Sequence, residues 1–266
     1  MRLSWTLLFI IFSTASSVAD PNARVFESDN DVNLNKYVTD EIVDAYLDVE
    51  TGDGTHAAEV FIRLAEDGNP IAQLELGRHY ELGQILERDP YLAFSWTKLA
   101  ANNGVTQAQY NLGVNYRDGF GTAVDSGQAI DWFVRAAQNG HSFAQHNLGI
   151  MYGRGEVVER SYETAASWYQ KAAVQGLPQS QYEYALLLRR GSGVEKDPPQ
   201  AFEWLIKAAA QDHRLSFVEL ARMYHTGVGV AANCERFEYW YRKAAEAGVP
   251  EAQQYFERKP DECKRQ

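Results

Sequence analysis

The sequence predicts an all-α protein: a right-handed superhelical solenoid of antiparallel helix pairs that repeat with a period of 36 residues. Three sets of residues predict this fold because they keep the same step along the chain. The tryptophans lie at Trp96, Trp132, Trp168, Trp204 and Trp240. Alanine pairs begin at Ala100, Ala136, Ala172, Ala208 and Ala244, and glycines recur at Gly83, Gly119, Gly155, Gly191 and Gly227. Chance does not maintain several registers over five copies, so the chain is an array of repeats.

The chain opens with a segment typical of a cleavable export signal, residues 1–19. Arg2 precedes an apolar run from Leu7 to Phe12, and small residues lead up to Ala19. This run is far shorter than the roughly 20 residues that cross a bilayer, and no later stretch is apolar enough to do so. We therefore expect a mature protein that begins at Asp20 and is not inserted in a membrane.

The mature chain is acidic, because residues 20–266 contain 24 basic and 36 acidic residues. Nucleic acids and anionic lipids bind clusters of Lys and Arg, so this balance argues against both as partners. A neutral or basic partner fits the charge. The alternative interpretation is that the acidity only keeps the chain soluble.

Each repeat is predicted to begin with a helix of about 13 residues. Short polar side chains open the six copies, at Asp53, Asp89, Asp125, Ser161, Asp197 and Asn233. Such side chains accept hydrogen bonds from the free N–H groups at a helix N-terminus. Pro90 and Pro198 follow at the first helical position, where a missing N–H costs nothing. The repeats are therefore placed at 53–88, 89–124, 125–160, 161–196, 197–232 and 233–258.

A second helix follows each first helix after a short turn. Asp212 and five glycines occupy the turn, where glycine permits the left-handed backbone that ends a helix: Gly68, Gly104, Gly140, Gly176 and Gly248. Pro70, Pro178 and Pro250 then mark helix starts. Two helices joined by so short a turn lie antiparallel, and stacking on the next copy supplies the core that a single pair lacks.

The predicted core combines small and large residues. Alanines and glycines let the helices approach closely, and the five tryptophans are expected to fill the space that they leave. Tyrosines of the second helices complete this core, at Tyr80, Tyr116, Tyr152 and Tyr224. A tryptophan row also suggests a stacking platform for glycans, but the helical spacing with alanines favours a core. Tyr91, Phe94 and Tyr239 flank core positions and are candidates for a groove surface.

Two segments frame the repeats. Residues 20–52 are expected to contain a disordered stretch, 20–35, and a capping helix over residues 37–49. At the other end, Pro260 stops the second helix of the sixth repeat, which is interpreted as a terminal cap. Residues 259–266 are a C-terminal tail.

The repeat pattern is A-x-x-W-x-x-x-A-A-x-x-G followed by A-Q-x-x-L-G-x-x-Y-x-x-G. The third copy carries it almost whole, at Ala129, Trp132, Ala136-Ala137, Gly140, Ala144-Gln145, Leu148-Gly149, Tyr152 and Gly155. This pattern resembles the Sel1-like repeat family over residues 53–256. The resemblance implies a tetratricopeptide-like superhelix that acts as an adaptor, regulator or inhibitor. It also implies a bacterial periplasmic location, although the export signal alone fits a eukaryotic secretory compartment as well.

Cys234 and Cys263 are the two cysteines. They flank the last helix pair at neighbouring ends, and an even pair in an exported protein is usually bonded. We predict a disulfide between them, which would stabilise this end by about 3 kcal/mol. Members of the family with a cysteine pair in every repeat form a different subgroup.

No catalytic, cofactor or metal site is predicted. Ser95 and Lys98 fit the S-x-x-K pattern of serine acyl enzymes, and some cysteine-rich family members have been discussed as β-lactamase-like. However, Trp96 between them belongs to the repeat, and no K-T-G or S-D-N segment accompanies the pair. The six histidines have no metal-ligand spacing and are expected at the surface or between helices.

The leading hypothesis is an exported, non-catalytic scaffold that binds another protein on the concave face of its first helices. An immunity protein or inhibitor that neutralises a toxic enzyme is the alternative. A β-lactamase-like hydrolase is a second alternative, which the sequence does not favour. The identity of the partner and its contact residues do not follow from the sequence.

Overall fold

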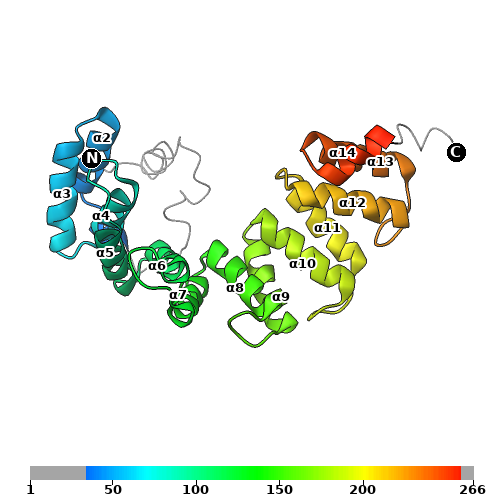
Figure 1. Ribbon diagram of the computed structural model, residues 1–266, viewed down its shortest axis with the longest axis horizontal. Coiled ribbons are helices and arrows are strands. Elements are labelled where there is room, and N and C mark those ends of the chain that lie inside the picture. The colour runs from blue at the N-terminus through cyan, green and yellow to red at the C-terminus, as the bar shows by residue number, and fades with distance from the viewer. Residues whose placement is uncertain (1–33, 259–266) are drawn as a thin grey trace. The chain divides into compact units, whose positions relative to one another are not determined.

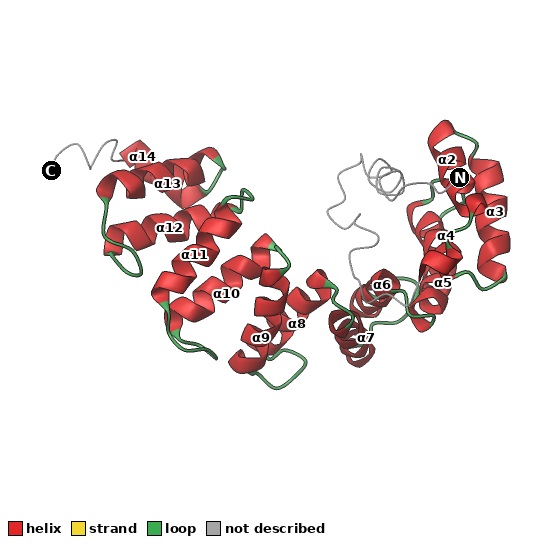
Figure 2. Cartoon of the chain, turned by 180° about the vertical axis from the view of Figure 1, so that it is seen from behind, coloured by secondary structure: helices red, strands yellow, loops and turns green. Residues whose placement is uncertain are grey.

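The computed structural model describes residues 34–258. The predicted export signal, almost all of the predicted disordered stretch, the C-terminal tail and Cys263 lie outside the described residues. This part of the chain forms helices joined by turns and loops, and no strand (Figure 2). A short 3-10 helix, η1 (Leu34–Tyr37), comes first. The α-helices, labelled in Figure 1, are α2 (Asp40–Thr51), α3 (Gly54–Glu66), α4 (Pro70–Leu82), α5 (Pro90–Asn102), α6 (Thr106–Asp118), α7 (Ser126–Gln138), α8 (Ser142–Arg154), α9 (Tyr162–Val174), α10 (Pro178–Arg190), α11 (Pro198–Ala209), α12 (Arg214–Thr226), α13 (Cys234–Glu246) and α14 (Pro250–Arg258).

The first helix of every repeat begins at its predicted cap. Asp53 accepts a hydrogen bond from the N–H of His56, and Asn233 accepts one from the N–H of Arg236, at 3.3 and 2.9 Å. The other four cap side chains accept in the same way, at Asp89, Asp125, Ser161 and Asp197. Replacing such a cap costs about 1 kcal/mol of stability. The six caps confirm the phase of the repeat.

The turns between the helices of a pair also follow the prediction. The five turn glycines have positive φ, for example 86° at Gly68 and 97° at Gly176. Asp212, with φ 58°, is the only non-glycine residue of the described chain in this conformation. A side chain is strained there, because its Cβ approaches the next carbonyl oxygen. The fifth repeat therefore keeps the turn at an energetic cost.

Helices of successive repeats pack more extensively on each other than the two helices of one repeat do. This holds for α4 on α5 compared with α3 on α4, and for α12 on α13 compared with α11 on α12. A single helix pair therefore leaves its larger apolar face uncovered. Stacking of repeats provides the core, as in other linear repeat proteins.

The prediction that the tryptophans fill the space beside the small residues is wrong for the glycines of the second helices. A Cβ on Gly113 would lie 2.8 Å from the ring of Phe133, and one on Gly149 would lie 2.5 Å from the ring of Tyr169. The residue after each tryptophan thus meets the preceding second helix. Where that residue is Leu205, the second helix has Ala185 in place of glycine. Bulk lost on one side is replaced on the other, which keeps the packing dense.

The tryptophans themselves lie at the edge of the core. Trp132 is buried, with 6% exposure, whereas Trp96, Trp168, Trp204 and Trp240 are half-buried. The four predicted tyrosines, Tyr80, Tyr116, Tyr152 and Tyr224, are half-buried too. The position after the tryptophan is buried in four of the five copies, and Phe133 and Leu205 have no exposed surface, whereas Tyr241 is half-buried. One side of each half-buried indole therefore remains near the surface.

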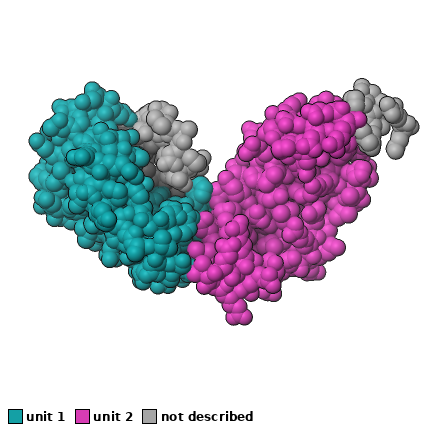
Figure 3. Space-filling model, in the orientation of Figure 1, with its two compact units in different colours: residues 1–144 teal, residues 145–266 magenta. Residues whose placement is uncertain are grey.

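The chain divides into two compact units, residues 1–144 and 145–266 (Figure 3). The core of the first unit is centred on Phe61, Leu76 and Leu112. The core of the second contains Leu205, Leu220 and Met223. Each unit carries about three repeats on a core of its own.

Candidate functional site

A ladder of buried amides joins successive repeats inside each unit. The amide of Gln73 donates to the carbonyl oxygen of Ala65 at 3.1 Å and accepts from Asn103 of the next repeat at 2.8 Å. Gln109 repeats both contacts with Ala101 and Asn139. In the second unit, Gln211 donates to Gln181 at 3.1 Å. Each glutamine thus satisfies the end of its own first helix and fixes the next one. The sequence shows the conserved spacing of these glutamines but not their partners.

The ladder matters for function because it sets the first helices in a fixed register. Equivalent side chains of these helices are then presented at regular steps along each unit. Positions not used for packing are free to differ between repeats. A regular scaffold with variable exposed positions is the arrangement by which repeat proteins build extended binding surfaces.

Cations lie over three of the five tryptophans that mark the repeat. Lys171 and Lys207 lie 4.0 Å from the ring centroids of Trp168 and Trp204, and the Arg135 guanidinium lies 4.4 Å from that of Trp132. In each case the cation is three residues after the tryptophan, one turn along the same helix face. Such contacts stabilise exposed sites by about 0.5–1 kcal/mol. The covered rings are poorly placed to stack on a glycan.

The aromatic candidates for a groove surface have different environments. Tyr91 is 74% exposed and Tyr239 is 47% exposed. Phe94 is half-buried and packs edge-on against Tyr116, with the two ring centroids 5.4 Å apart. Tyr91 and Tyr239 are therefore available to a partner, whereas Phe94 belongs to the packing of its repeat.

The Ser95 and Lys98 pair does not form an activated nucleophile. The Ser95 hydroxyl donates to the carbonyl oxygen of Tyr91 at 2.8 Å, a bond back along its own helix. The Lys98 ammonium lies 5.8 Å from the ring centroid of Phe94. A nucleophile needs a base within hydrogen-bond reach, and Lys98 is directed at a ring instead. This geometry does not support the hydrolase alternative.

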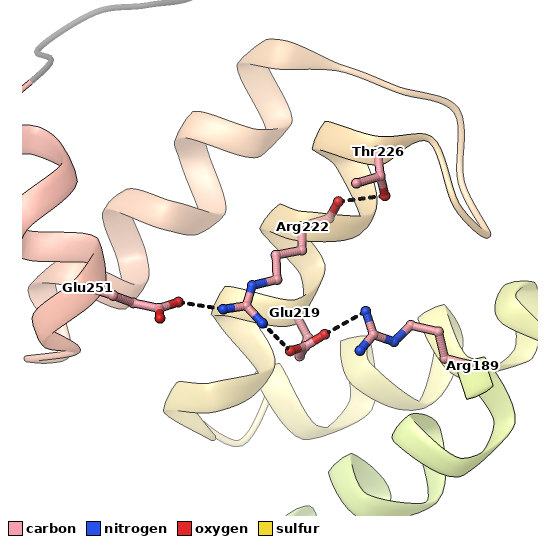
Figure 4. Close-up of polar contacts among 5 residues, drawn as sticks. All are labelled: Arg189, Glu219, Arg222, Thr226 and Glu251. Atoms are coloured by element: carbon pink, nitrogen blue, oxygen red, sulfur yellow. Dashed lines mark hydrogen bonds and ion pairs between the residues drawn. The ribbon is translucent and has the colours of Figure 1, made fainter. Parts of the chain in front are cut away.

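An ion-pair network crosses three second helices of the second unit (Figure 4). Buried Glu219 on α12 contacts Arg189 of α10 at 3.0 Å and Arg222 of its own helix at 3.1 Å. Arg222 also reaches Glu251 of α14 at 3.0 Å. The buried carboxylate is compensated by two guanidinium groups, as a charge away from water requires. The network ties the fourth, fifth and sixth repeats together, and nothing in it points to a reaction.

Three of the histidines, His79, His141 and His146, are packing groups, whereas His56 and His225 are exposed. Burial lowers the pKa of His79, His141 and His146 to about 4, so each is uncharged at neutral pH. His141 accepts from the N–H of Ala144 and caps α8, while His146 lies 2.8 Å from the hydroxyl of buried Ser180. His79 has no exposed surface. The expected inter-helix location applies to these residues, although the complete burial of His79 was not predicted.

Three further features of residues 34–258 bear on the predictions. No group of three His, Cys, Asp or Glu in this range is arranged to hold a metal ion. No helix in the range combines the length and apolarity needed to cross a membrane. Cys234 opens α13, but Cys263 lies outside the described residues. The disulfide stays a prediction, and thiol labelling of the unreduced protein, which should find no reactive cysteine, would check it.

The two units differ in charge. Residues 34–144 contain 7 basic and 16 acidic residues, whereas residues 145–258 contain 13 basic and 14 acidic residues. The acidity of the chain is therefore concentrated in the first unit. Long-range attraction of a basic partner would act mainly there.

The comparisons with known proteins agree with this architecture. The Sel1 repeat family matches residues 70–105, 106–141, 142–177, 178–213 and 218–249, so that the first four matches each begin at a second helix. Repeats of this family form a protein-interaction fold. Among curated proteins, no sequence matches the chain.

Solved structures show the same fold. The chain is similar to c5321, a protective antigen of uropathogenic Escherichia coli with an SLR fold, at 33% identity and a TM-score of 0.76, covering 85% of this chain and 52% of that one. It thus spans about half the length of that protein. A Sel1 repeat protein from Oxalobacter formigenes is 30% identical, with a TM-score of 0.70, over 81% of this chain and 88% of that one.

A weaker likeness, to an immunity protein of Pseudomonas aeruginosa, has 18% identity and a TM-score of 0.46 over 82% of this chain and 88% of that one. It carries no argument about function. The repeat matches, the stacked helix pairs and the two closer structures agree. The chain belongs to the Sel1 repeat family.

Proposed function

We propose that this chain is an exported, non-catalytic scaffold that binds another protein through the exposed faces of its first helices. The observation that carries the proposal is the contrast between buried and exposed positions of these helices. Four residues after the N-cap, at a buried position, five of the first helices have the same residue: Ala57, Ala93, Ala129, Ala165 and Ala201. One residue earlier, at a position that is exposed except for half-buried Thr164, the same helices have His56, Leu92, Gln128, Thr164 and Gln200.

Packing therefore fixes one side of each helix and leaves the other free to vary. An array of fixed helices with different side chains on the outside is suited to recognising an extended protein surface. Two serines lie within hydrogen-bond distance of a histidine, Ser180 beside His146 and Ser216 beside His213, but neither serine has exposed surface for a substrate to reach. The charge is also unsuited to nucleic acid. The interaction therefore involves another protein, and the concave face formed by successive first helices is the proposed place of contact.

Affinity capture tests the binding function. Tagged residues 20–266 would be crosslinked mildly in the native envelope, and bound proteins identified by mass spectrometry. The purified candidate should then bind the purified chain in a calorimetric titration. Retention of background proteins only, or a candidate that fails to bind after purification, would contradict the scaffold function.

Export is tested separately. The protein recovered from the periplasmic fraction should begin at Asp20. A variant with Leu8→Arg, which interrupts the apolar run, should remain in the cytoplasm. If both forms are found in the same compartment with Met1 retained, the export part of the proposal is wrong while the binding function is untouched.

An inhibitor or immunity role is the second candidate, favoured by the 16 acidic residues among residues 34–144, which suit a basic enzyme as target. Deleting the gene discriminates the two roles. Loss of an immunity protein harms cells only beside a toxin producer, whereas loss of a scaffold has the same effect whether or not a toxin producer is present. The hydrolase alternative requires an activity that disappears in a folded Ser95→Ala variant.

A further inference from the structure

The first helix of the second repeat, α5, differs from the first helices of the other five repeats at the position three residues after the tryptophan. Three residues after Trp96 the chain has Leu99. The five other copies have a basic residue at this position: Arg63, Arg135, Lys171, Lys207 and Lys243. The basic residue that covers the indole in three other repeats is therefore replaced here by an apolar side chain.

A second substitution on the same face extends this change. Leu92 takes the place that His56, Gln128, Thr164, Gln200 and Arg236 hold in the other copies. Leu92, Trp96 and Leu99 are spaced by four and three residues, so they form one stripe along the helix. Leu92 is 40% exposed and Leu99 is 45% exposed.

Folding does not account for this stripe. The buried face of α5 is made by Ala93, Thr97, Ala100 and Ala101, on an adjoining side of the helix. Trp96 packs partly on the core of the first unit, but Leu92 and Leu99 leave much of their surface to water. Five of six repeats are built with polar residues at both positions. An exposed apolar stripe retained against that pattern is typical of an interaction surface.

The charge around the stripe specifies its partner. The first unit has 16 acidic and 7 basic residues, and the position of Ser95 on α5 is taken by Glu59 in α3 and Asp131 in α7. Arg63 is paired with Glu41 at 3.1 Å, and Arg135 lies over Trp132. The neighbouring first helices thus carry acids at this position, and their basic residues are engaged, while Lys98 on α5 itself lies over the ring of Phe94.

We propose that the stripe Leu92–Trp96–Leu99 binds a basic amphipathic helix of a partner protein. Its length, two helical turns or about 10 Å, matches a partner helix with apolar residues at the i, i+4 and i+7 positions. Lysines and arginines beside those residues would face the acids of the first unit. This inference rests on the proposed protein-binding function and names the class of partner.

The test uses fluorescent synthetic helices as probes, measured by anisotropy against the purified mature chain. The first peptide has Leu on one face and Lys on the other. The second keeps the Leu positions but replaces Lys with Glu, and the third keeps Lys but replaces Leu with Ser. Binding of the first peptide alone, weakened by added salt, is the expected result.

Two matched variants locate the binding. Leu99→Gln should weaken binding of the Leu/Lys peptide about fivefold. It should alter neither the charge nor the fold, because polar residues occupy this position in the other repeats. Leu215→Gln is the control, since Leu215 on α12 of the second unit is 50% exposed. It should leave the affinity unchanged. Circular dichroism would verify that both variants are folded.

Several results would overturn the inference. If the Leu99→Gln variant binds the Leu/Lys peptide as tightly as the parent chain does, the stripe is not the binding site. If the Glu or Ser peptide binds as tightly as the Leu/Lys peptide, the stripe does not select a basic amphipathic helix. A concentration-dependent dimer that Leu99→Gln abolishes would assign the stripe to a second copy. If a captured natural partner binds Leu99→Gln as well as the parent chain, the scaffold function stands and this inference fails.

Discussion

The two units have the same internal architecture but different surfaces. In both, capped first helices, left-handed turns and an amide ladder repeat at the same positions. The first unit is strongly acidic and exposes a leucine stripe on α5. The second unit is nearly balanced in charge and covers Trp168 and Trp204 with lysines. The buried positions are thus constrained by packing, and the exposed positions carry what differs. We therefore expect the binding properties to differ between the two units, whereas the contacts that stabilise the fold are shared by their repeats.

The largest loss of stability should come from replacing a loop glycine that has an equivalent in the other unit. Gly121 has φ 66°, and a Cβ there would overlap the carbonyl oxygen of Pro90. We expect Gly121→Ala to destabilise the protein by about 3 kcal/mol, measured by urea unfolding. Gly229→Ala should behave alike, because its Cβ would lie 2.5 Å from the carbonyl oxygen of Pro198.

Gly68→Ala is the control for this comparison. Its φ is also positive, at 86°, but no atom lies within 4 Å of the added Cβ. It should cost only about 1 kcal/mol, from backbone strain alone. Equal losses in Gly68→Ala and Gly121→Ala would show that the close contact with Pro90 is unimportant.

The ion-pair network should stabilise only the second unit. Glu219→Gln leaves two arginines facing a neutral amide, and we expect a loss of about 2 kcal/mol, since Arg222 is partly solvated. Glu203→Gln, at an exposed position of α11, should change stability by less than about 0.5 kcal/mol. Equal urea midpoints for the two variants would mean that the network does not contribute.

Acid should weaken the first unit through His79. Its pKa is about 4 in the folded protein, against an ordinary value near 6.5, so between these values the unfolded chain binds more protons. Stability is therefore lost as the pH falls from about 6.5 to 4, and His79 accounts for about 2 kcal/mol between pH 7.5 and 5. His79→Met should remove this part of the pH dependence. Methionine stands at the equivalent position in two other repeats, as Met151 and Met223.

The measurement is urea unfolding of His79→Met and the parent chain at both pH values. His225→Gln is the control, because His225 is exposed. It should change the stability at pH 7.5 by less than about 0.5 kcal/mol. If His79→Met keeps the pH dependence of the parent chain, burial of His79 does not cause the acid sensitivity.

The smallest effect should be a gain in the second unit. Asp212 has φ 58° where the other repeats have glycine. Asp212→Gly relieves the strain but makes the unfolded chain more flexible, so we expect a net stabilisation of about 0.5 kcal/mol. Differential scanning calorimetry would show a slightly raised Tm, and a lowered Tm would mean that the Asp212 side chain compensates its strain.

The sequence predicted the parts of the fold that depend on local chemistry. Cap residues such as Asp89 and turn glycines such as Gly104 act within a few bonds of their own position. Their side-chain type and spacing therefore define the helices before any packing is known. The period of 36 residues follows in the same way, because each copy repeats the same local choices.

Contacts between repeats were not predictable in the same detail. The sequence marks Trp132 and Phe133 as adjacent large residues, but only the packed structure shows that Phe133 meets Gly113 and that Trp132 lies under Arg135. Gln73 likewise finds Asn103 at a separation of 30 residues. Which side of a helix faces which neighbour depends on rotation and crossing of whole helices, a property of many contacts together.

For this protein, the sequence by itself determined the helix pairs, their number and their order, because capping and turn chemistry are local. The tertiary structure decided which large residue fills each gap, which histidines are buried and which leucines of α5 remain exposed. The physical reason is that burial belongs to a pair of surfaces rather than to a residue. A leucine has the same spacing in the chain whether its neighbour covers it or leaves it open to a partner.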